Sequence, residues 1–206
     1  MAEKRESTFI NMVLVLFVVT LVASAALAGV YELTKEPIAA AKLAKKLNAI
    51  KEVVPAFDNN PSDEAYRVGI NEKDTLEFYP AKKDGKLVGT AVKTFTNKGF
   101  GGNVWIMVGF KPDGTVYNYS VLEHTETPGL GTKMVSWFKP TDQAREKSSI
   151  INKNPGTTNF TVSKDGGDID AITAATISSR AFLDAIQTGY NEYMKNNQKK
   201  EEVSNE

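Results

Sequence analysis

Hydroxyl side chains crowd the segment DAITAATISS, which runs from Asp170 to Ser179. They belong to Thr173, Thr176, Ser178 and Ser179, just ahead of a stretch with helical periodicity. The first turn of a helix carries unpaired N–H groups and a partial positive charge, and both stabilise a phosphate. A threonine hydroxyl placed there either caps the helix or is a nucleophile that becomes esterified to that phosphate. The residues alone leave both interpretations open.

A second candidate segment, HTETPGLGTK, begins at His124. Pro128 and Gly129 occupy the central positions that a type II turn requires, so the turn is predicted to span Thr127 to Leu130 and to expose backbone amides. The alternative is an ordinary turn that leads into a short helix at residues 134–138.

Composition excludes several kinds of chemistry. The chain has no cysteine and one histidine, which excludes disulfides, thiolate zinc sites, iron–sulfur ligation and thiol catalysis. We find no dinucleotide fingerprint and no acid/base constellation. Lys+Arg and Asp+Glu are balanced at 25 each, so we expect no nucleic-acid partner. Redox chemistry would therefore need a bound organic cofactor.

The elements that position these residues begin with an uncharged apolar run, Phe9 to Tyr31, which is long enough to cross a membrane. A cleaved signal peptide is the alternative, since residues 26–28 read Ala-Leu-Ala. Lysines after the run would place the soluble part inside by the positive-inside rule, but that rule is weak for long translocated domains. We expect a retained single-pass anchor in the inner or plasma membrane, with an extracytoplasmic domain.

A helix is predicted from Thr34 to Pro55, with Thr34 as its cap and Pro37 in its first turn. One face is apolar, and the lysines on the other face contact either solvent or anionic headgroups. The expected buried residues are Ile38, Leu43, Leu47, Ile50 and Val54.

Two β-hairpins are predicted at residues 76–95 and 104–122, with turns at Asp84-Gly85 and Pro112-Asp113-Gly114. The glycine-rich segment 96–103 between them is expected to be a flexible loop or a bulge. Another short strand pair is predicted within residues 160–172.

The last helix is predicted over residues 178–196, with a buried face formed by Phe182, Ala185, Ile186, Tyr190 and Tyr193. The fold class is α+β, a transmembrane helix followed by one soluble domain with an antiparallel sheet and flanking helices. The expected boundaries are a tail at 1–8, the span at 9–31, the soluble domain at 34–195 and a disordered tail at 196–206.

The segment from Asp170 to Ser178 resembles the pattern D-x-x-[S/T]-G-A-T-x-[S/T] of the FMN-binding domain family. Ala174 stands where glycine is commonest, and the other pattern positions match. HTETPGLG is similar to the second block of that family. The soluble domain is therefore identified as a member of the FMN-binding domain family.

The resemblance implies roles for these residues. The FMN phosphate would form a phosphoester with Thr176, while Thr173 and Ser178 hydrogen-bond it and Asp170 is read by a flavin transferase that uses FAD. Ser179 has no implied role and is expected to be a solvated first-turn residue. Ala174, Ala175 and Ile177 complete the binding segment. Contacts to the ring are expected from Glu126, Thr127, Leu130, Gly131 and Lys133.

The order of the blocks behind one N-terminal span resembles the G-subunit family of Rnf electron-transport complexes. The alternative is the C-subunit family of sodium-pumping NADH:quinone reductases. Either resemblance implies a membrane-anchored electron carrier that works with other membrane subunits, and the first implies coupling of ferredoxin and NAD chemistry to ion transport. Two further alternatives are an anchored binding or assembly domain without a cofactor and a stand-alone extracytoplasmic reductase.

Overall fold

The computed structural model describes residues 8–72 and 74–204, with side chains through residue 198. The chain divides into two compact units between Ala44 and Lys45, later than the predicted boundary at residue 34. Residues 1–7 of the predicted N-terminal tail lie outside the described part.

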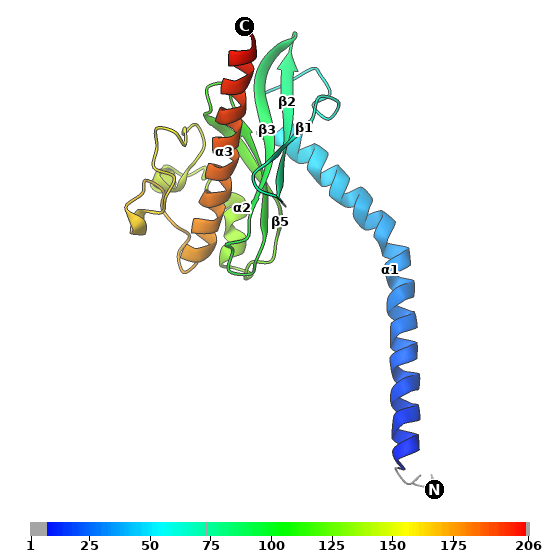
Figure 1. Cartoon of the computed structure of the whole chain (residues 1–206). Helices are drawn as coiled ribbons and strands as arrows, with labels where there is room; N and C mark the ends of the chain where they lie inside the picture. The colour runs from blue at the N-terminus through cyan, green and yellow to red at the C-terminus, as the bar shows by residue number, and fades with distance from the viewer. Residues whose placement is uncertain (1–7, 73, 205–206) are drawn as a thin grey trace. The chain divides into compact units, whose positions relative to one another are not determined.

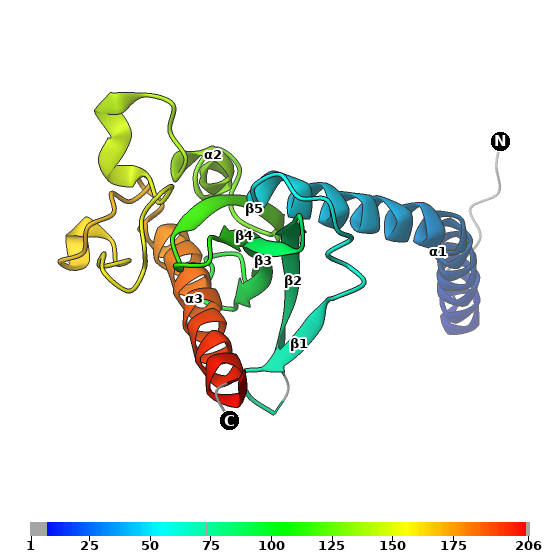
Figure 2. The same ribbon diagram turned by 90° about the horizontal axis from the view of Figure 1, so that it is seen from above.

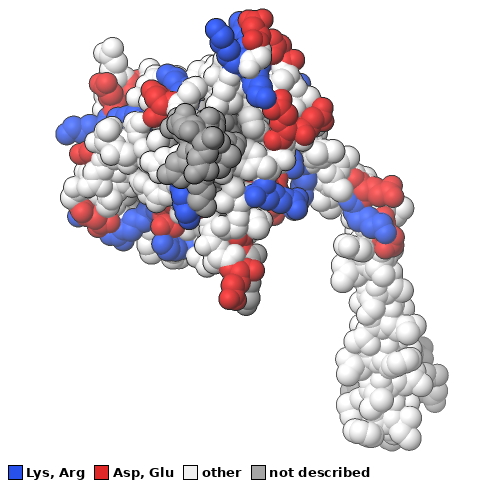
Figure 3. All heavy atoms as spheres, turned by 45° about the horizontal axis from the view of Figure 1, so that its top comes forward, with Lys and Arg blue, Asp and Glu red and all other residues white. Residues whose placement is uncertain are grey.

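Helix α1 (Phe9–Val53) begins at the predicted start of the apolar run. Among the described helices it alone is long and apolar enough to cross a membrane. Figure 3 shows the apolar portion as a white surface without blue or red atoms. The large apolar side chains of this portion are exposed, which is typical of a helix that faces lipid.

The predicted helix start at Thr34 is wrong, because α1 continues through it. The Thr34 hydroxyl donates to the Val30 carbonyl oxygen at 2.8 Å, one turn back, so it does not cap. Pro37 consequently lies inside the helix. Glutamate, leucine and lysine at residues 32–36 favour helix and give α1 no reason to end there.

The predicted buried face of this segment is only partly confirmed. Ile50 and Val54 are buried, whereas Ile38, Leu43 and Leu47 are exposed. Ala49, Ile50 and Val53 at the end of α1 pack in the smaller core on the sheet, and this accounts for the burial of that end of the helix.

The soluble unit contains one antiparallel sheet, as predicted (Figure 1). Its strands lie in the order β1-β2-β3-β4-β5, which Figure 2 shows with all five labelled. Its strands are β1 (Tyr66–Gly69), β2 (Thr75–Lys83), β3 (Lys86–Thr96), β4 (Val104–Phe110) and β5 (Val116–His124). Both hairpins are confirmed. Asp84 and Gly85 have φ values of 52° and 75°, the left-handed pair that a tight two-residue hairpin turn needs. Strand β1 was not predicted.

Side chains alternate between the two faces of the sheet, and both faces are covered. Phe78 and Val92 point into the larger core, which helix α3 (Thr176–Ser204) shares. Their neighbours Tyr79 and Ala91 point to the other face, where the last turns of α1 cover them. Figure 2 shows α3 running along the sheet. This burial on both faces fixes the register of β2 and β3.

Helix α3 confirms the predicted last helix. Phe182, Ala185, Ile186 and Tyr193 are fully buried, and Tyr190 packs at the edge of the same core. The helix continues through Ser204, so residues 196–204 of the expected tail lie within α3. Tyr193 packs against Phe110 of β4 with the ring centroids 5.4 Å apart, and this contact attaches α3 to the sheet.

The region between β5 and α3 contains short helices, namely η1 (Gly131–Lys133), α2 (Met134–Trp137), η2 (Gln143–Ser148) and η3 (Ser163–Asp165). The strand pair predicted within residues 160–172 is wrong. A single parallel bridge joins Val162 to Ile169, and η3 lies between them. Turn-like backbone hydrogen bonds hold this loop, for example from the Ser163 N–H to the Ile169 carbonyl oxygen at 2.8 Å. An ion pair between Asp165 and Arg180 at 2.7 Å attaches it to α3.

Candidate functional site

The start of α3 is formed by a tight turn. The Ala175 N–H donates to the Ile172 carbonyl oxygen at 3.0 Å, and Ala174, with φ 61°, occupies the third position of that turn. A type II turn requires a left-handed residue at this position, which explains why glycine suits it. The first helical hydrogen bond runs from the Ser179 N–H to the Ala175 carbonyl oxygen at 3.0 Å.

Thr176 is the first residue of α3, and Ala175 occupies the cap position. An alanine side chain cannot cap a helix. Thr176 is half-buried, and its hydroxyl makes no hydrogen bond within the described part of the chain. The interpretation of Thr176 as a helix cap is therefore wrong.

Ser179 is fully buried, which corrects the expectation of a solvated residue. Its hydroxyl donates to the Ala175 carbonyl oxygen at 2.9 Å and accepts a hydrogen bond from the Ile172 N–H at 2.9 Å. These two bonds hold the tight turn against the first turn of α3. Ser179 thus sets the backbone geometry around Thr176.

The two sequence motifs meet at the Glu126 carboxylate. Glu126 is 5% exposed and Ser178 is 3% exposed, and the Ser178 hydroxyl donates to Glu126 Oε2. The other carboxylate oxygen, Oε1, accepts from the Gly101 N–H at 3.0 Å. The Glu126 N–H donates to His124 Nδ1 at 3.3 Å. One buried side chain therefore joins α3 to the loop between β3 and β4.

Glycine is required where these elements approach each other. A Cβ at Gly131 would lie 2.5 Å from Ser178 Oγ and 2.6 Å from Glu126 Oε2. A Cβ at Gly101 would lie 2.0 Å from the Thr125 carbonyl oxygen. Both positions exclude any larger side chain unless the backbone shifts.

The predicted type II turn is present. The Leu130 N–H donates to the Thr127 carbonyl oxygen at 3.2 Å, and Gly129 has φ 75°. The Gly129 N–H donates to the Thr132 hydroxyl at 3.0 Å. Thr127 and Leu130 are exposed at this turn, as is Lys133 beyond it, whereas Glu126 and Gly131 on either side are buried.

The short helix after the turn is confirmed and is fixed by Tyr119. The Tyr119 hydroxyl donates to the Met134 carbonyl oxygen at 2.7 Å and accepts from the Phe138 N–H at 3.2 Å. Burial raises the pKa of the Tyr119 hydroxyl, so it remains a neutral donor. The Tyr119 ring also packs against Phe182 of α3. The turn at residues 127–130 thus leads into a short helix, α2, that Tyr119 holds against the core.

Asp170 is exposed at the other end of the motif. Its Oδ1 accepts a hydrogen bond from the Ser163 hydroxyl at 2.6 Å, and its carbonyl oxygen accepts one from Trp137 Nε1 at 3.0 Å. The backbone is therefore fixed while the carboxylate remains accessible to solvent.

The Glu126 carboxylate contacts Gly101, Gly131 and Ser178, and an exposed apolar residue directly precedes each of these three in the sequence. Leu130 is 38% exposed and precedes Gly131, while Ile177 is 48% exposed and precedes Ser178. Phe100 is 68% exposed and precedes Gly101. Each of the three residues is bonded to a residue that contacts the Glu126 carboxylate, so their Cα atoms lie near one region of the molecule. Thr173 and Ala174 are exposed on its α3 side.

The segment 96–103 is the part of this region that sequence reasoning missed. The expected flexible loop is instead a turn in which the Gly102 N–H donates to the Gly99 carbonyl oxygen at 3.3 Å. The glycine spacing was the available signal, since three glycines around one phenylalanine allow the backbone to approach Glu126 closely.

These residues fit a flavin nucleotide better than a metal ion. No cluster of metal-ligating side chains occurs in residues 8–72 and 74–204. Among the described residues, the start of α3 offers backbone N–H groups with no side-chain cap, the Thr176 hydroxyl without a partner, and exposed apolar side chains nearby. Phosphate and an aromatic ring are the two chemical parts that such a surface accommodates.

The chain matches two protein families, the FMN-binding domain over residues 99–191 and the RnfG N-terminal region over residues 1–53. Its relatives include proteins named as G subunits of ion-translocating oxidoreductase complexes. That of Erwinia tasmaniensis is 36% identical over 143 residues, which cover 67% of each chain. That of Haemophilus influenzae is 35% identical over 76% of each chain, and that of Vibrio cholerae is 30% identical over 94% of this chain and 92% of its own.

Proposed function

Because the chain belongs to the G-subunit family of ion-translocating oxidoreductase complexes, we propose that it is the membrane-anchored electron carrier of such an Rnf complex and carries FMN covalently on Thr176. The relatives from Erwinia, Haemophilus and Vibrio are all G subunits, which favours this family over the C subunits of quinone reductases. Ferredoxin and NAD as the redox partners of the whole complex remain part of the proposal.

One observation carries the covalent attachment. Thr176 occupies the first position of α3, where its hydroxyl has no hydrogen bond in the described chain and the preceding Ala175 cannot cap the helix. A phosphate esterified there would accept hydrogen bonds from the first-turn N–H groups and would be stabilised by the helix dipole. The exposed Thr173 hydroxyl lies within the same turn and could add another.

The other site residues would hold the flavin in place. Leu130 and Ile177 offer apolar contact to the ring, and Thr127 and Lys133 lie exposed near the same turn. The buried layer beneath these residues holds them in place, since its members contact one another; they are Glu126, Gly131 and Ser178. When bound, FMN supplies the ability to accept and release single electrons. The chain contributes position, a fixed electrostatic environment and restriction to the membrane plane.

Attachment requires a flavin transferase, and Asp170 is proposed as part of the sequence that this FAD-dependent enzyme reads. The exposed carboxylate on a fixed backbone suits recognition by another protein. Asp170→Ala should lower flavin loading without unfolding the protein, measured as the loaded fraction by intact mass after co-expression with the transferase. The control is Asp165→Ala, an exposed carboxylate that pairs with Arg180 and should load normally. Complete loading of Asp170→Ala would remove Asp170 from the recognition sequence.

The decisive experiment for the proposed function is the mass of the protein purified from cells that contain the transferase. The wild-type chain should carry one FMN, fluoresce on a denaturing gel, and yield a flavin-modified peptide that contains Thr176. Thr176→Ala should be colourless and should fold normally, since that hydroxyl makes no hydrogen bond in the described chain. A wild-type protein of unmodified mass would instead indicate an anchored assembly domain without a cofactor.

A further inference from the structure

The turn Gly99–Gly102 is held rigidly from one side by the segment that follows β5. The Gly101 N–H donates to Glu126 Oε1 at 3.0 Å, and the Thr125 hydroxyl donates to the Gly101 carbonyl oxygen at 2.5 Å. Both backbone polar groups of Gly101 are thereby fixed. The neighbouring Phe100 cannot move far without breaking these bonds.

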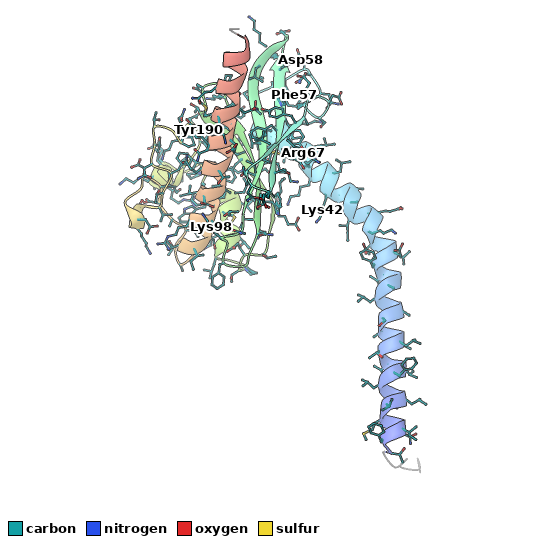
Figure 4. All side chains as sticks on the ribbon, viewed as in Figure 1. Lys42, Phe57, Asp58, Arg67, Lys98 and Tyr190 are labelled. Carbon is teal, nitrogen blue, oxygen red and sulfur yellow. The ribbon has the colours of Figure 1, made fainter. Side chains whose placement is uncertain are left out.

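The same segment is held from the other side by α3. The Thr96 hydroxyl donates to Asp184 Oδ2 at 2.8 Å, and Lys98 Nζ forms an ion pair with Asp184 Oδ1 at 2.7 Å. Figure 4 shows Lys98 beside the part of α3 that lies farthest from the chain's C-terminus. The turn is therefore attached to the helix that carries Thr176 as well as to Glu126.

Phe100 projects from this fixed turn with 68% of its surface exposed. It is the most exposed of the large apolar residues described in the soluble unit. An exposed aromatic ring on a backbone that is fixed by hydrogen bonds offers a preformed apolar surface to a ligand. Leu130 and Ile177 are also exposed, and each is adjacent in sequence to a residue that contacts Glu126.

We infer that Phe100 is a contact residue for the isoalloxazine ring, and that the Gly99–Gly102 turn is the third element of the flavin site. The inference rests on the proposed attachment of FMN to Thr176. Attachment keeps the ring near the start of α3 at high effective concentration. Phe100 is held to that helix through Asp184 and through the Glu126–Ser178 pair. Aromatic rings of this kind pack face to face with an offset, or edge to face.

Phe100→Trp tests the contact directly. An indole in contact with an excited flavin transfers an electron to it and receives the electron back, so the flavin returns to its ground state without emission. In the full-length loaded protein we expect Phe100→Trp to lose most of its flavin fluorescence relative to wild type. The matched control is Tyr117→Trp, a 36% exposed aromatic at the opposite end of β5, about 20 Å from His124 by strand rise. This control should keep wild-type emission.

Phe100→Ala provides the complementary measurement. Removing a side chain that covers one part of the ring should make flavin emission about twofold more sensitive to quenching by iodide, because flavin pockets bury most of the ligand surface. Intact mass is measured on every variant, and only loaded protein is compared. Loaded Phe100→Trp with wild-type emission would overturn the inference. Wild-type protein without flavin would instead overturn the proposed function.

Discussion

At the scale of single residues, the four hydroxyl groups of the motif have different tasks. Ser179 and Ser178 are buried and make structural hydrogen bonds, one to the turn and one to Glu126. Thr176 is half-buried without a bond in the described chain, and Thr173 is exposed. A buried hydroxyl that satisfies a backbone N–H stabilises the fold, whereas one without a partner remains available for chemistry. The two serines therefore stabilise the start of α3, and Thr176 is left available for reaction.

Ala174 gives the first prediction at this scale. The left-handed φ of 61° is unfavourable for alanine, because its Cβ clashes with the backbone, and glycine would not incur this penalty. Ala174→Gly should raise the free energy of unfolding by up to about 1 kcal/mol, reduced by the greater freedom of glycine in the unfolded chain. Urea denaturation of the detergent-solubilised protein measures this change.

The control is Ala181→Gly, a buried position inside α3 without a left-handed backbone. It should destabilise the protein by about 1 kcal/mol, since glycine is a poor helix former. If Ala174→Gly also destabilised the protein, the turn would not hold Ala174 in the left-handed conformation.

At the scale of elements, the site is assembled from three chain segments that are distant in sequence. They are the turn at residues 99–102, the turn at residues 127–130 and the start of α3. The Glu126 carboxylate connects all three, because it bonds Gly101 and Ser178 and lies against Gly131. A buried carboxylate without such partners would be strongly destabilising. The contacts of Glu126 with the three segments are therefore expected to form together or not at all.

Gly131→Ala tests this assembly. The added Cβ would meet Ser178 Oγ and Glu126 Oε2 at 2.5 and 2.6 Å, so α3 and the turn must move apart. We expect a loss of about 1–3 kcal/mol in the free energy of unfolding, together with reduced flavin loading. Denaturation and intact mass report the two effects separately.

Gly129→Ala is the matched comparison. Its Cβ would enter open space, and only the left-handed φ of 75° opposes the change. The cost should be about 1 kcal/mol. An equal or larger cost at Gly129 would show that close packing around Glu126 is not what holds the elements together.

At the scale of the whole molecule, the apolar part of α1 is the membrane anchor and the soluble unit contains the candidate site. The described residues of α1 up to Ala44 belong to a separate compact unit, and their apolar side chains are exposed. Such a surface is stable only in lipid or against other membrane proteins. The membrane anchor is therefore a property of the sequence, whereas the side on which the soluble unit lies is proposed to be extracytoplasmic.

The absence of cysteine makes the orientation measurable. Lys86→Cys introduces a single thiol at the exposed first residue of β3, next to the turn from β2. A maleimide that cannot cross membranes should label this variant in intact cells of a Gram-positive host or in spheroplasts. Labelling that appears only after lysis would place the soluble unit in the cytoplasm, and the unsubstituted chain should remain unlabelled in both cases.

The sequence by itself determined the local features of this protein. The apolar run predicted the membrane helix, Asp84-Gly85 and Pro112-Asp113-Gly114 predicted the hairpins, and Pro128-Gly129 predicted the type II turn. Each of these depends on the side chains and backbone preferences of consecutive residues. The predicted helix start at Thr34 failed, because a threonine hydroxyl can cap a new helix or bond back within a continuing one.

Only the tertiary structure decided which polar groups are buried and what they contact. Nothing in the local sequence distinguishes the buried Ser178 and Ser179 from the exposed Thr173. The glycine turn also looked flexible until Glu126, twenty-five positions later, was placed against Gly101. Burial and long-range hydrogen bonds depend on how β3, β5 and α3 pack together, and that packing is a property of the whole domain because every strand and helix competes for the same core.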